Sequence, residues 1–304
     1  MESQIRRVDF TTANDSNEYY HKQHDFVSSS GLKKLKISPA HFKADQEQES
    51  EQKDCFDFGS AYHSMILEPD KFDTEFFVLY EDTIIEILIS EGAKKPRATN
   101  KYKDWYMEQE DIAAGRTIID TPTYKHIVAM RDTIYRHRYA KSLLSGGMSE
   151  QSFYCDLEFY DGEKIKCRIR PDKVNIDKRI HISLKTTRDA SIRGFAKQSA
   201  NFEYHISDAM YTDILEKCYY NGRAFNTIVI CQETIYPYAF NMFELSNQYL
   251  GQGRYEFEQL CKLYNYCINN DKWPGYQIFC PNKYGLNVLD LPVYAVNELN
   301  FYIH

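Results

Sequence analysis

The residues of this sequence that could do chemistry together are an aspartate and a lysine on two neighbouring predicted strands. Asp172 stands at the end of one strand, and on the next strand the alternation of side chains puts His181, Ser183 and Lys185 on a single face. An acid beside a lysine is the minimum for metal-assisted phosphodiester hydrolysis, because the acid holds Mg²⁺ and the lysine neutralises developing charge. The same pattern also fits an exposed ion pair on a hairpin, and spacing alone favours that alternative.

The strands that must position these residues are predicted from the centre of the sequence. Polar and apolar residues alternate on both sides of Asp161-Gly162, which is a strong signal for a β-hairpin. Two further strands are expected over residues 173–177 and 179–187. The other predicted elements are helices over residues 56–69, 123–144, 192–200, 203–220 (ending at Asn221-Gly222) and 246–268, and strands over residues 225–233 and 238–245. This order predicts an α/β fold with a central mixed β-sheet flanked by helices.

The sequence divides into an N-terminal segment, residues 1–54, and a larger core, residues 55–304. The first part holds a short amphipathic helix, LKKLKI, that a serine in SSS would cap, and an acidic, Gln-rich connector over residues 44–54. Residues 70–120 are expected to form a lobe inserted beside the core. The sequence shows no internal repeat.

Composition excludes several classes of protein. The chain has 304 residues, of which 43% are hydrophobic and 27% charged, and these values are typical of globular proteins rather than of disordered or fibrous ones. Its longest apolar run, residues 76–80, is far too short for a membrane helix, and the N-terminus lacks an apolar secretion signal. We therefore expect a cytoplasmic protein that does not contact a membrane. The eight cysteines form no CxxC pair and are interpreted as buried thiols.

The charge balance argues against a protein that coats nucleic acid. Lys and Arg total 37 and Asp and Glu total 44, which gives a net charge of −7. Binding to nucleic acid would therefore depend on local basic clusters, which lie around residues 33–36, 136–141, 168–173 and 188–197. Such clusters are more often solvated surface than binding sites. The 25 tyrosines could stack on unpaired bases, although core packing is the simpler explanation.

Five motifs, in order along residues 28–220, resemble those of one nuclease family. The segment RPDKVNIDKRIHISLKTT is similar to the core of the PD-(D/E)XK nuclease superfamily, and specifically of the RecE-like exonucleases of phage recombination, exonuclease VIII. SSSGLKKLKISPAHF resembles their N-terminal DNA-contacting segment, and FGSAYHSMILEP resembles their GxxxH helix. SEQSFY with CRIRPD resembles the strands that enter the site, and YHISDAMYTDIL the helix after the catalytic strand. The resemblance implies a restriction-endonuclease-like core and favours the metal site over the surface ion pair.

The resemblance also assigns roles to individual residues. Asp172 would be the principal metal carboxylate, and Lys185 would be the lysine of the (D/E)XK motif. His63, which ends GxxxH, and Glu150, the acidic residue upstream of the hairpin, would be further metal ligands. Leu184 would belong to the same metal site. The cofactor implied is Mg²⁺ or Mn²⁺.

Two departures from the family pattern concern the catalytic residues. Ser183 stands where the family has its second carboxylate, and Ser207 where it has the Gln of a QxxxY motif whose tyrosine is Tyr211. A hydroxyl is a poor ligand for Mg²⁺, so this loss should weaken the site by at least about 10 to 100-fold. Three explanations stay open: a carboxylate from elsewhere, with Asp208 on the same helix stripe as first candidate; a catalytically inactive protein that still binds DNA; or an engineered serine.

The function implied by the resemblance is hydrolysis of phosphodiester bonds from the ends of duplex DNA. The implied partners are double-stranded DNA ends, a single-strand annealing protein, and other copies of the chain in a ring-shaped homo-oligomer. The alternatives are a catalytically inactive DNA-end-binding protein with this fold and, third, an unrelated phage structural protein. The residues expected to contact DNA are Ser30, Lys33, Lys34, Lys36, Arg168, Arg170 and Arg188.

Overall fold

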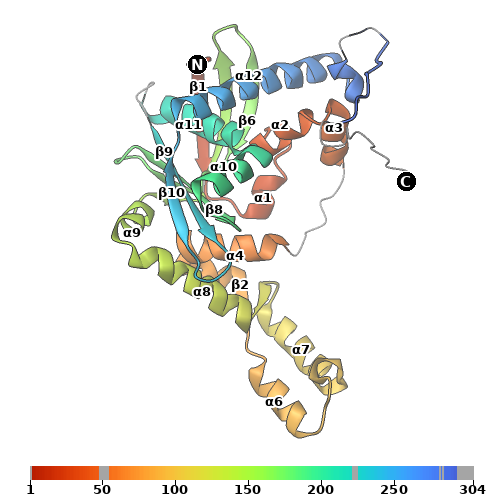
Figure 1. Cartoon of the computed structure of the whole chain (residues 1–304), viewed down its shortest axis with the longest axis vertical. Helices are drawn as coiled ribbons and strands as arrows, with labels where there is room; N and C mark the ends of the chain where they lie inside the picture. Colours follow the sequence, from red (N-terminus) through yellow and green to blue (C-terminus); the bar gives the residue numbers. More distant parts are fainter. Residues whose placement is uncertain (1, 48–54, 221–224, 281, 283, 293–304) are drawn as a thin grey trace, which may run out of the picture.

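The strands of the computed structural model form one five-stranded sheet and two smaller sheets (Figure 1). The structure describes residues 2–47, 55–220, 225–280, 282 and 284–292. The main sheet has the order β10-β9-β8-β7-β4, in which β8 and β9 are parallel and the other neighbours are antiparallel. Its strands are β4 (Met148–Ser149), β7 (Lys173–Asn175), β8 (Ile180–Thr187), β9 (Asn226–Glu233) and β10 (Phe240–Glu244). The predicted central mixed sheet is therefore confirmed.

A second sheet is joined to the main one by the chain itself. It has the order β1-β5-β6, with all neighbours antiparallel, and consists of β1 (Ile5–Ala13), β5 (Ser152–Phe159) and β6 (Lys164–Ile169). β5 and β6 are the hairpin predicted around Asp161-Gly162. After β6 the chain runs through Pro171 and Asp172 directly into β7, so that Asp172 lies where the two sheets meet.

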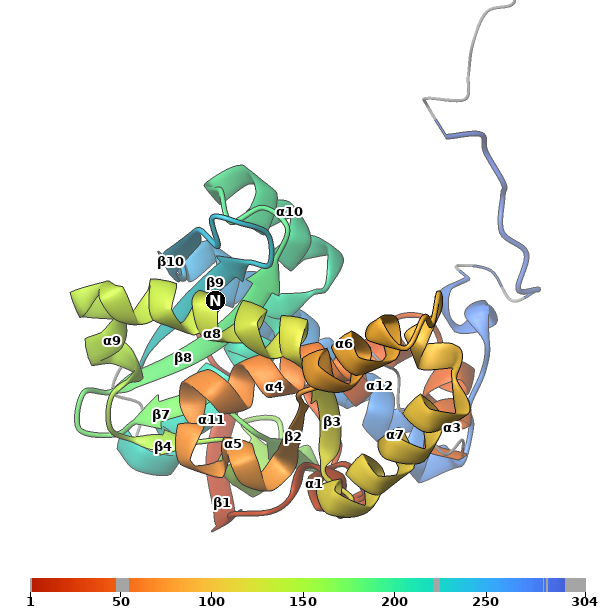
Figure 2. The same cartoon turned by 90° about the horizontal axis from the view of Figure 1, so that it is seen from below.

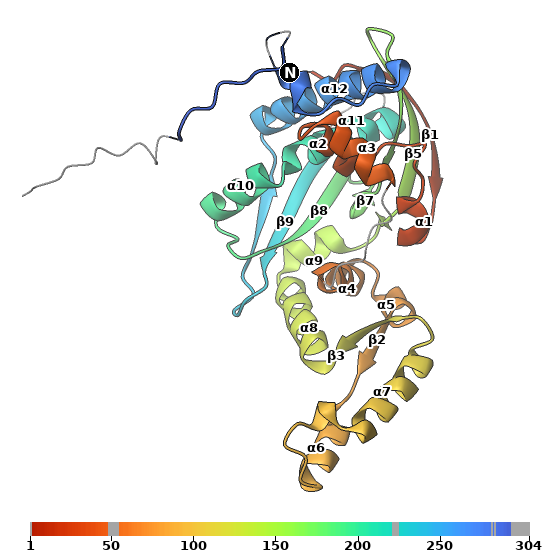
Figure 3. The ribbon, with the colours of Figure 1, turned by 90° about the vertical axis from the view of Figure 1, so that its right-hand side faces the viewer.

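Helices cover both faces of the main sheet, and the alternation of residues along β8 decides what each face contacts (Figures 1 and 3). The helices of these layers are α2 (Ser29–Leu35), α4 (Cys55–Leu67), α8 (Thr121–Arg136), α9 (Arg138–Leu144), α10 (Ile192–Asn201), α11 (Tyr204–Tyr220) and α12 (Asn247–Asn270). Ile182 and Leu184 are buried in one apolar cluster with residues of α4, α8 and α9. His181 points to the other face, where its ring lies against that of Tyr211 on α11. The two faces that the sequence predicts for this strand are confirmed.

A lobe projects from the body below α4 and α8 (Figures 1 and 2). Its elements are α5 (Pro69–Glu75), β2 (Phe76–Leu79), α6 (Asp82–Ser90), η1 (Pro96–Ala98), α7 (Asn100–Ala113) and β3 (Thr117–Asp120). β2 and β3 are parallel and pack on α4 and α8 through a small apolar cluster. Inside the lobe, the buried carboxylate of Glu81 accepts hydrogen bonds from Arg97 (3.0 Å) and Tyr102 (2.6 Å).

The remaining elements show where the sequence prediction differs from the structure. They are α1 (Asn17–His21), α3 (Pro39–Glu47) and η2 (Tyr276–Phe279). α3 includes the start of the predicted connector, while residues 48–54 and the expected helix end at 221–222 lie outside the described residues. β1 was not predicted, because in this edge strand only Ile5 is fully buried and no alternation of polar and apolar residues marks it. β1 and α2 both pack with the core, and a domain boundary after residue 54 stays a prediction.

The helix predicted over residues 123–144 is two helices. His137 leaves the helical conformation, with φ −84° and ψ 110°, and ends α8. Its Nδ1 then accepts a hydrogen bond from the N–H of Ala140 at 3.2 Å and so caps α9. Among the described helices, none combines the length and the apolar character needed to cross a membrane.

Candidate metal centre

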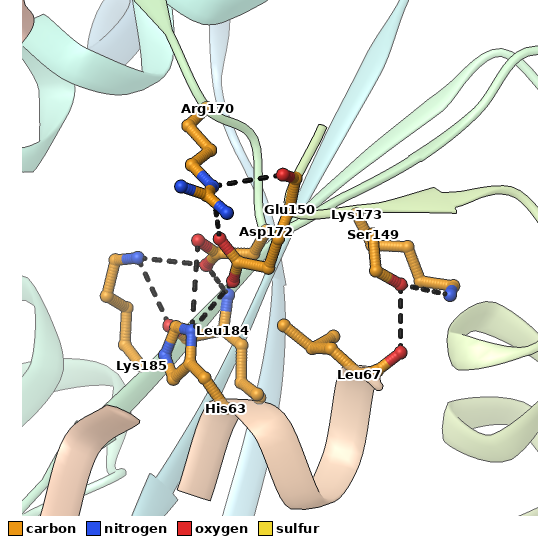
Figure 4. A network of polar contacts seen from close by, with 9 residues as sticks. All are labelled: His63, Leu67, Ser149, Glu150, Arg170, Asp172, Lys173, Leu184 and Lys185. Atoms are coloured by element: carbon orange, nitrogen blue, oxygen red, sulfur yellow. Dashed lines mark hydrogen bonds and ion pairs between the residues drawn. The ribbon is translucent and has the colours of Figure 1, made fainter. Parts of the chain in front are cut away.

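His63, Glu150, Asp172 and Lys185 come from four elements and meet where the two sheets join (Figure 4). His63 lies on α4, Glu150 directly after β4, Asp172 directly before β7, and Lys185 on β8. Glu150 has a left-handed backbone with φ 48°, and its N–H donates to the carbonyl of Asp172 at 3.2 Å. The main chain therefore fixes the two acidic residues side by side, and α4 brings the imidazole to them.

The three side chains offer one nitrogen and two carboxylate oxygens to a common point. Nδ1 of His63 lies 3.4 Å from Oε1 of Glu150 and 4.0 Å from Oδ1 of Asp172, and the three donor atoms lie within 4.8 Å of one another. Ligands of one Mg²⁺ lie about 2.1 Å from the ion and hence at most about 4.2 Å from each other. A small closing movement would thus bring all three to one divalent cation, and oxygen-rich donors suit Mg²⁺ or Mn²⁺. Within the described ranges no second group of three such donors is found.

The second oxygen of Asp172 is held by β8. Oδ2 accepts hydrogen bonds from the N–H of Leu184 at 2.6 Å and from Nζ of Lys185 at 3.1 Å. Nζ of Lys185 also donates to the carbonyl of Leu184 at 3.1 Å. Asp172 therefore has one oxygen directed at His63 and one bound to β8, the strand that carries Lys185. This arrangement leaves the first oxygen for a cation.

Burial and nearby charges shift the pKa of each ionisable group of this centre. Burial alone would raise the pKa of Asp172, but Lys185, His63 and a main-chain N–H hold it below its usual range. Burial raises the pKa of Glu150 in spite of His63. Burial would lower the pKa of His63, but the two carboxylates outweigh it and raise the pKa. Carboxylates likewise overcome burial at Lys185 and raise its pKa, so this side chain stays an ammonium. Two carboxylates therefore lie beside an imidazole in a half-buried site, and a bound cation would favour their charged forms.

Arg170, predicted to contact DNA, braces the metal centre. Its Nε donates to the carbonyl of Glu150 at 3.0 Å and lies 3.4 Å from Oε2 of the same residue, and Nη2 donates to the carbonyl of Asp15 at 2.9 Å. Its Nη1 is buried without a hydrogen-bond partner among the described residues. The guanidinium thus holds Glu150 in place, a role that no spacing in the sequence indicates.

Ser183 and Ser207, the residues at the two departures from the family pattern, lie on β8 and α11. Ser183 is buried, 4% exposed, on the same face of β8 as His181. Ser207 lies on α11 and is half-buried. Tyr211 lies on α11 with its ring against that of His181, and burial raises the pKa of its hydroxyl although Ser29 and the main chain of Arg170 oppose the shift. Its part in catalysis stays a prediction.

Asp208 is buried on the Lys185 side of the centre. Its side chain is 4% exposed, and its Oδ2 accepts a hydrogen bond from the hydroxyl of Tyr249 at 3.0 Å. Burial raises the pKa of Asp208 to about 6, although Lys185 and Lys33 oppose the shift. The group of three metal donors is completed by Glu150 without it. Asp208 therefore lies outside the group of three donors, with the hydroxyl of Tyr249 as its hydrogen-bond donor, and its role as a substitute metal ligand stays a prediction.

Most of the residues predicted to contact DNA already form ion pairs or hydrogen bonds within the protein. Lys34 pairs with Asp45, and Lys36 lies 2.5 Å from both Glu203 and Glu256. Arg168 is buried, and its guanidinium donates to the main-chain carbonyls of residues 21 and 23. Ser30 and Arg188 are exposed, and Nζ of Lys33 donates to the carbonyl of Phe202 at 3.2 Å. Contacts of these residues with DNA stay predictions, and the geometry favours them least for Arg168.

A polar clamp holds α4 against the sheet and was not predicted. The hydroxyl of Ser149 donates to the carbonyl of Leu67, the last residue of α4, at 2.9 Å, and accepts from Nζ of Lys173 at 2.9 Å (Figure 4). Ser149 precedes Glu150, and Lys173 follows Asp172. The residues next to the two acids therefore fix the helix that carries His63. The sequence offers one signal for this clamp: Lys173 directly follows Asp172, and consecutive side chains in an extended chain point to opposite faces.

Two comparisons show what this chain is similar to. A family model described as "PDDEXK-like domain of unknown function (DUF3799)" matches residues 28–282. Among solved structures, the crystal structure of a "putative exonuclease" from Eubacterium rectale has a TM-score of 0.57 and 15% sequence identity, and the match covers 92% of this chain and 96% of that chain. At this identity the likeness shows the fold alone. No curated protein matches the chain.

Proposed function

The chain belongs to the family of PDDEXK-like domains of unknown function (DUF3799), and from this premise we propose that it is a metal-dependent nuclease that hydrolyses phosphodiester bonds from the ends of duplex DNA. One observation carries the proposal. His63, Glu150 and Asp172 place three metal donors within 4.8 Å of one another, and Nζ of Lys185 lies 3.1 Å from the same aspartate. A surface ion pair on a hairpin would need neither the histidine nor the second acid.

The residues of the centre divide the work of hydrolysis between them. His63, Glu150 and Asp172 would hold a divalent cation, which when bound polarises a phosphate and makes water more acidic. Lys185 keeps its proton because its pKa is raised, so it serves to neutralise charge on the phosphate rather than to accept a proton. Its anchoring to Asp172 keeps that positive charge beside the cation site.

The finer parts of the proposal rest on the resemblance to RecE-like exonucleases. We propose Mg²⁺ or Mn²⁺ as the cofactor, digestion in phage or prophage recombination, and a cytoplasmic setting. The proposed partners are duplex DNA ends, a single-strand annealing protein and further copies of the chain in a homo-oligomer. The oxygen-rich donor set supports the choice of cation.

A second candidate function is an inactive DNA-end-binding protein. It is favoured by Ser183, which is buried beside Lys185 on β8 and supplies a hydroxyl where the family pattern has a carboxylate. In this case the fold and the basic side chains would keep DNA affinity, while hydrolysis would be lost.

An end-labelled linear duplex incubated with Mn²⁺ tests both functions. The native chain is compared with Lys185→Met, with Ser183→Asp and with Lys262→Met, which changes an exposed lysine on α12 that pairs with Asp161. A covalently closed circular duplex of the same sequence is added to each reaction as a substrate without ends.

The outcomes separate the candidates. Digestion of the linear duplex by the native chain and Lys262→Met, but not by Lys185→Met, supports the end-directed nuclease. Digestion by Ser183→Asp alone supports the inactive protein and locates the deficit at that position. Equal loss of the circle would contradict the requirement for an end, and activity of Lys185→Met would contradict the role of this centre.

A further inference from the structure

An exposed pair of aromatic rings lies between α10 and α11, next to the candidate metal centre. Phe202 follows α10 and is 61% exposed. Its ring is stacked on that of Tyr204, the first residue of α11, with centroids 5.6 Å apart and planes 15° apart. One face of Phe202 is therefore covered by an aromatic ring, while most of its surface is open to solvent.

The protein holds this exposed ring in place. The carbonyl of Phe202 accepts a hydrogen bond from Nζ of Lys33 at 3.2 Å. Glu203 has a left-handed backbone with φ 54°, a conformation that is unfavourable for a residue other than glycine, and it is tied to Lys36 by an ion pair of 2.5 Å. The turn is thus anchored on both sides of its backbone and presents a large apolar ring to water.

The second ring of the pair connects this surface to the catalytic lysine. Nζ of Lys185 lies 5.8 Å and Nζ of Lys33 lies 5.9 Å from the centroid of the Tyr204 ring, both within the range of a cation–π contact. Tyr204 is thus between the two lysines and Phe202. A phosphate bound at Lys185 would leave the base of the same or the next nucleotide within reach of the open ring.

We propose that Phe202, backed by Tyr204, is a stacking platform for an unpaired nucleobase beside the cleaved phosphate. The ligand class follows from the chemistry: a planar π surface binds a base face to face regardless of its sequence, and two neighbouring ammonium groups favour an anionic backbone. This inference rests on the proposed nuclease function and names the part of the substrate that the site would grip. It predicts that the chain separates the terminal bases of a duplex before or during cleavage.

Binding of a duplex with a short single-stranded overhang tests the platform. The overhang carries either normal bases or abasic nucleotides, its linkages are hydrolysis-resistant phosphorothioates, and affinity is measured by fluorescence anisotropy with Mn²⁺ present. The native chain should bind the overhang with bases on the order of tenfold more tightly than the abasic one. Phe202→Ala should remove this difference and leave the affinity for the abasic overhang unchanged.

Two further variants serve as matched controls. Phe202→Tyr keeps a ring and should retain the preference for bases. Tyr160→Ala removes an equally exposed ring, 63% exposed, in the turn of the β5–β6 hairpin, and should bind like the native chain. Thermal unfolding of each variant checks the fold.

Each of the other outcomes contradicts either the stacking platform or the nuclease proposal. If Phe202→Ala binds both overhangs as the native chain does, or loses affinity equally for both, the platform is wrong while the nuclease proposal stands. If the native chain binds neither duplex, the nuclease proposal fails and this inference fails with it.

Discussion

Two groups of charges with little exposure to solvent are balanced in different ways in this molecule. Asp213 of α11 and Arg254 of α12 form a closed pair, in which Nε of the arginine donates to both carboxylate oxygens at 2.8 and 3.0 Å. The candidate metal centre gathers an imidazole and two carboxylates within 4.8 Å, with one ammonium beside Asp172. In the first group one arginine takes both carboxylate oxygens. In the second group Lys185 and Arg170 each pair with one oxygen of an acid, and the other oxygen of each acid faces the imidazole of His63.

The difference separates a structural from a functional use of buried charge. A closed pair ties two helices together and gains nothing from an added ion. Burial raises the pKa of Glu150, and the neighbouring carboxylate of Asp172 adds to this shift, so a bound cation would stabilise the charged form of the acid. The supporting contacts agree with this division, because Arg170 holds Glu150 in place and the Ser149 clamp fixes the end of the helix that carries His63.

The sharpest way to break the comparison is to neutralise one charged residue in each group. Asp172→Asn should lower Mn²⁺ affinity by at least about 10 to 100-fold and DNA hydrolysis by about a thousandfold or more, because several kcal/mol of charge stabilisation depend on this ligand. Arg254→Met should change neither the affinity nor the rate constant at a temperature where it is folded. Titration calorimetry with Mn²⁺ measures the affinity, and an equal loss in both variants would contradict the division.

The next largest effect is expected on the free energy of unfolding. Here a change to the pair of Asp213 and Arg254 should have the larger effect. Arg254→Met leaves the carboxylate of Asp213 buried without its partner and should lower the free energy of unfolding by about 3–5 kcal/mol. The double change Asp213→Leu with Arg254→Met replaces the pair by apolar groups and should recover most of this loss. Urea denaturation measures both variants. A double variant no more stable than the single one would show that the helices need the charges themselves.

Asp208 offers a third test, because it shares α11 with Asp213 but has only a hydroxyl and distant lysines as partners. Its pKa of about 6 in the folded chain exceeds the value of about 3.9 expected when unfolded, so the charged form destabilises the fold. Asp208→Asn should therefore be more stable than the native chain by up to about 3 kcal/mol above about pH 7, and this gain should vanish as the pH falls from about 6 to 4. Urea denaturation across this range checks the sign.

The same variant also tests the substitute-ligand hypothesis. Since the three donors of the metal centre are complete without Asp208, Asp208→Asn should leave Mn²⁺ affinity unchanged. A loss comparable to that of Asp172→Asn would instead show that this carboxylate replaces the one missing at Ser183.

The sequence predicted those parts of the fold and site in which the signal is local. Alternation along β8 placed His181 and Lys185 on one face, and the Asp161-Gly162 turn located the hairpin. The motif resemblance brought together His63 and Asp172, which are far apart in the sequence but 4.0 Å apart in the structure. Strand faces can be predicted because they follow from the order of polar and apolar residues. Metal-site residues can be predicted because few residue types bind a cation.

Contacts between distant segments could not be predicted in this way. Lys36 stands in a basic cluster, yet one of its acidic partners, Glu256, is 220 residues away, and no spacing within the cluster reveals the pair. Arg170 resembles a phosphate-binding residue until its hydrogen bond to the carbonyl of Glu150 is known. A cluster of like charges in a sequence therefore overstates the positive surface that the folded chain offers to DNA.

The smallest expected effect concerns the Ser149 clamp, in which one hydroxyl bonds both the carbonyl of Leu67 and the ammonium of Lys173. Ser149→Ala removes the hydrogen bond to the carbonyl of Leu67 and one acceptor of the buried Lys173 ammonium, and should lower the free energy of unfolding by about 1–2 kcal/mol. Because this clamp fixes the end of α4, looser placement of His63 should also weaken Mn²⁺ binding severalfold. Ser145→Ala, which removes an exposed hydroxyl bonded to the carbonyl of Lys141, is the matched control.

A loss of stability without any loss of Mn²⁺ affinity would show that α4 is held mainly by its apolar packing on β8, where Leu184 lies in the same cluster as Ile66. A loss of both would show that the residues next to the acids position the imidazole for the cation. The clamp is made of neutral and positive groups, so it supports the acidic centre without adding a further carboxylate to it.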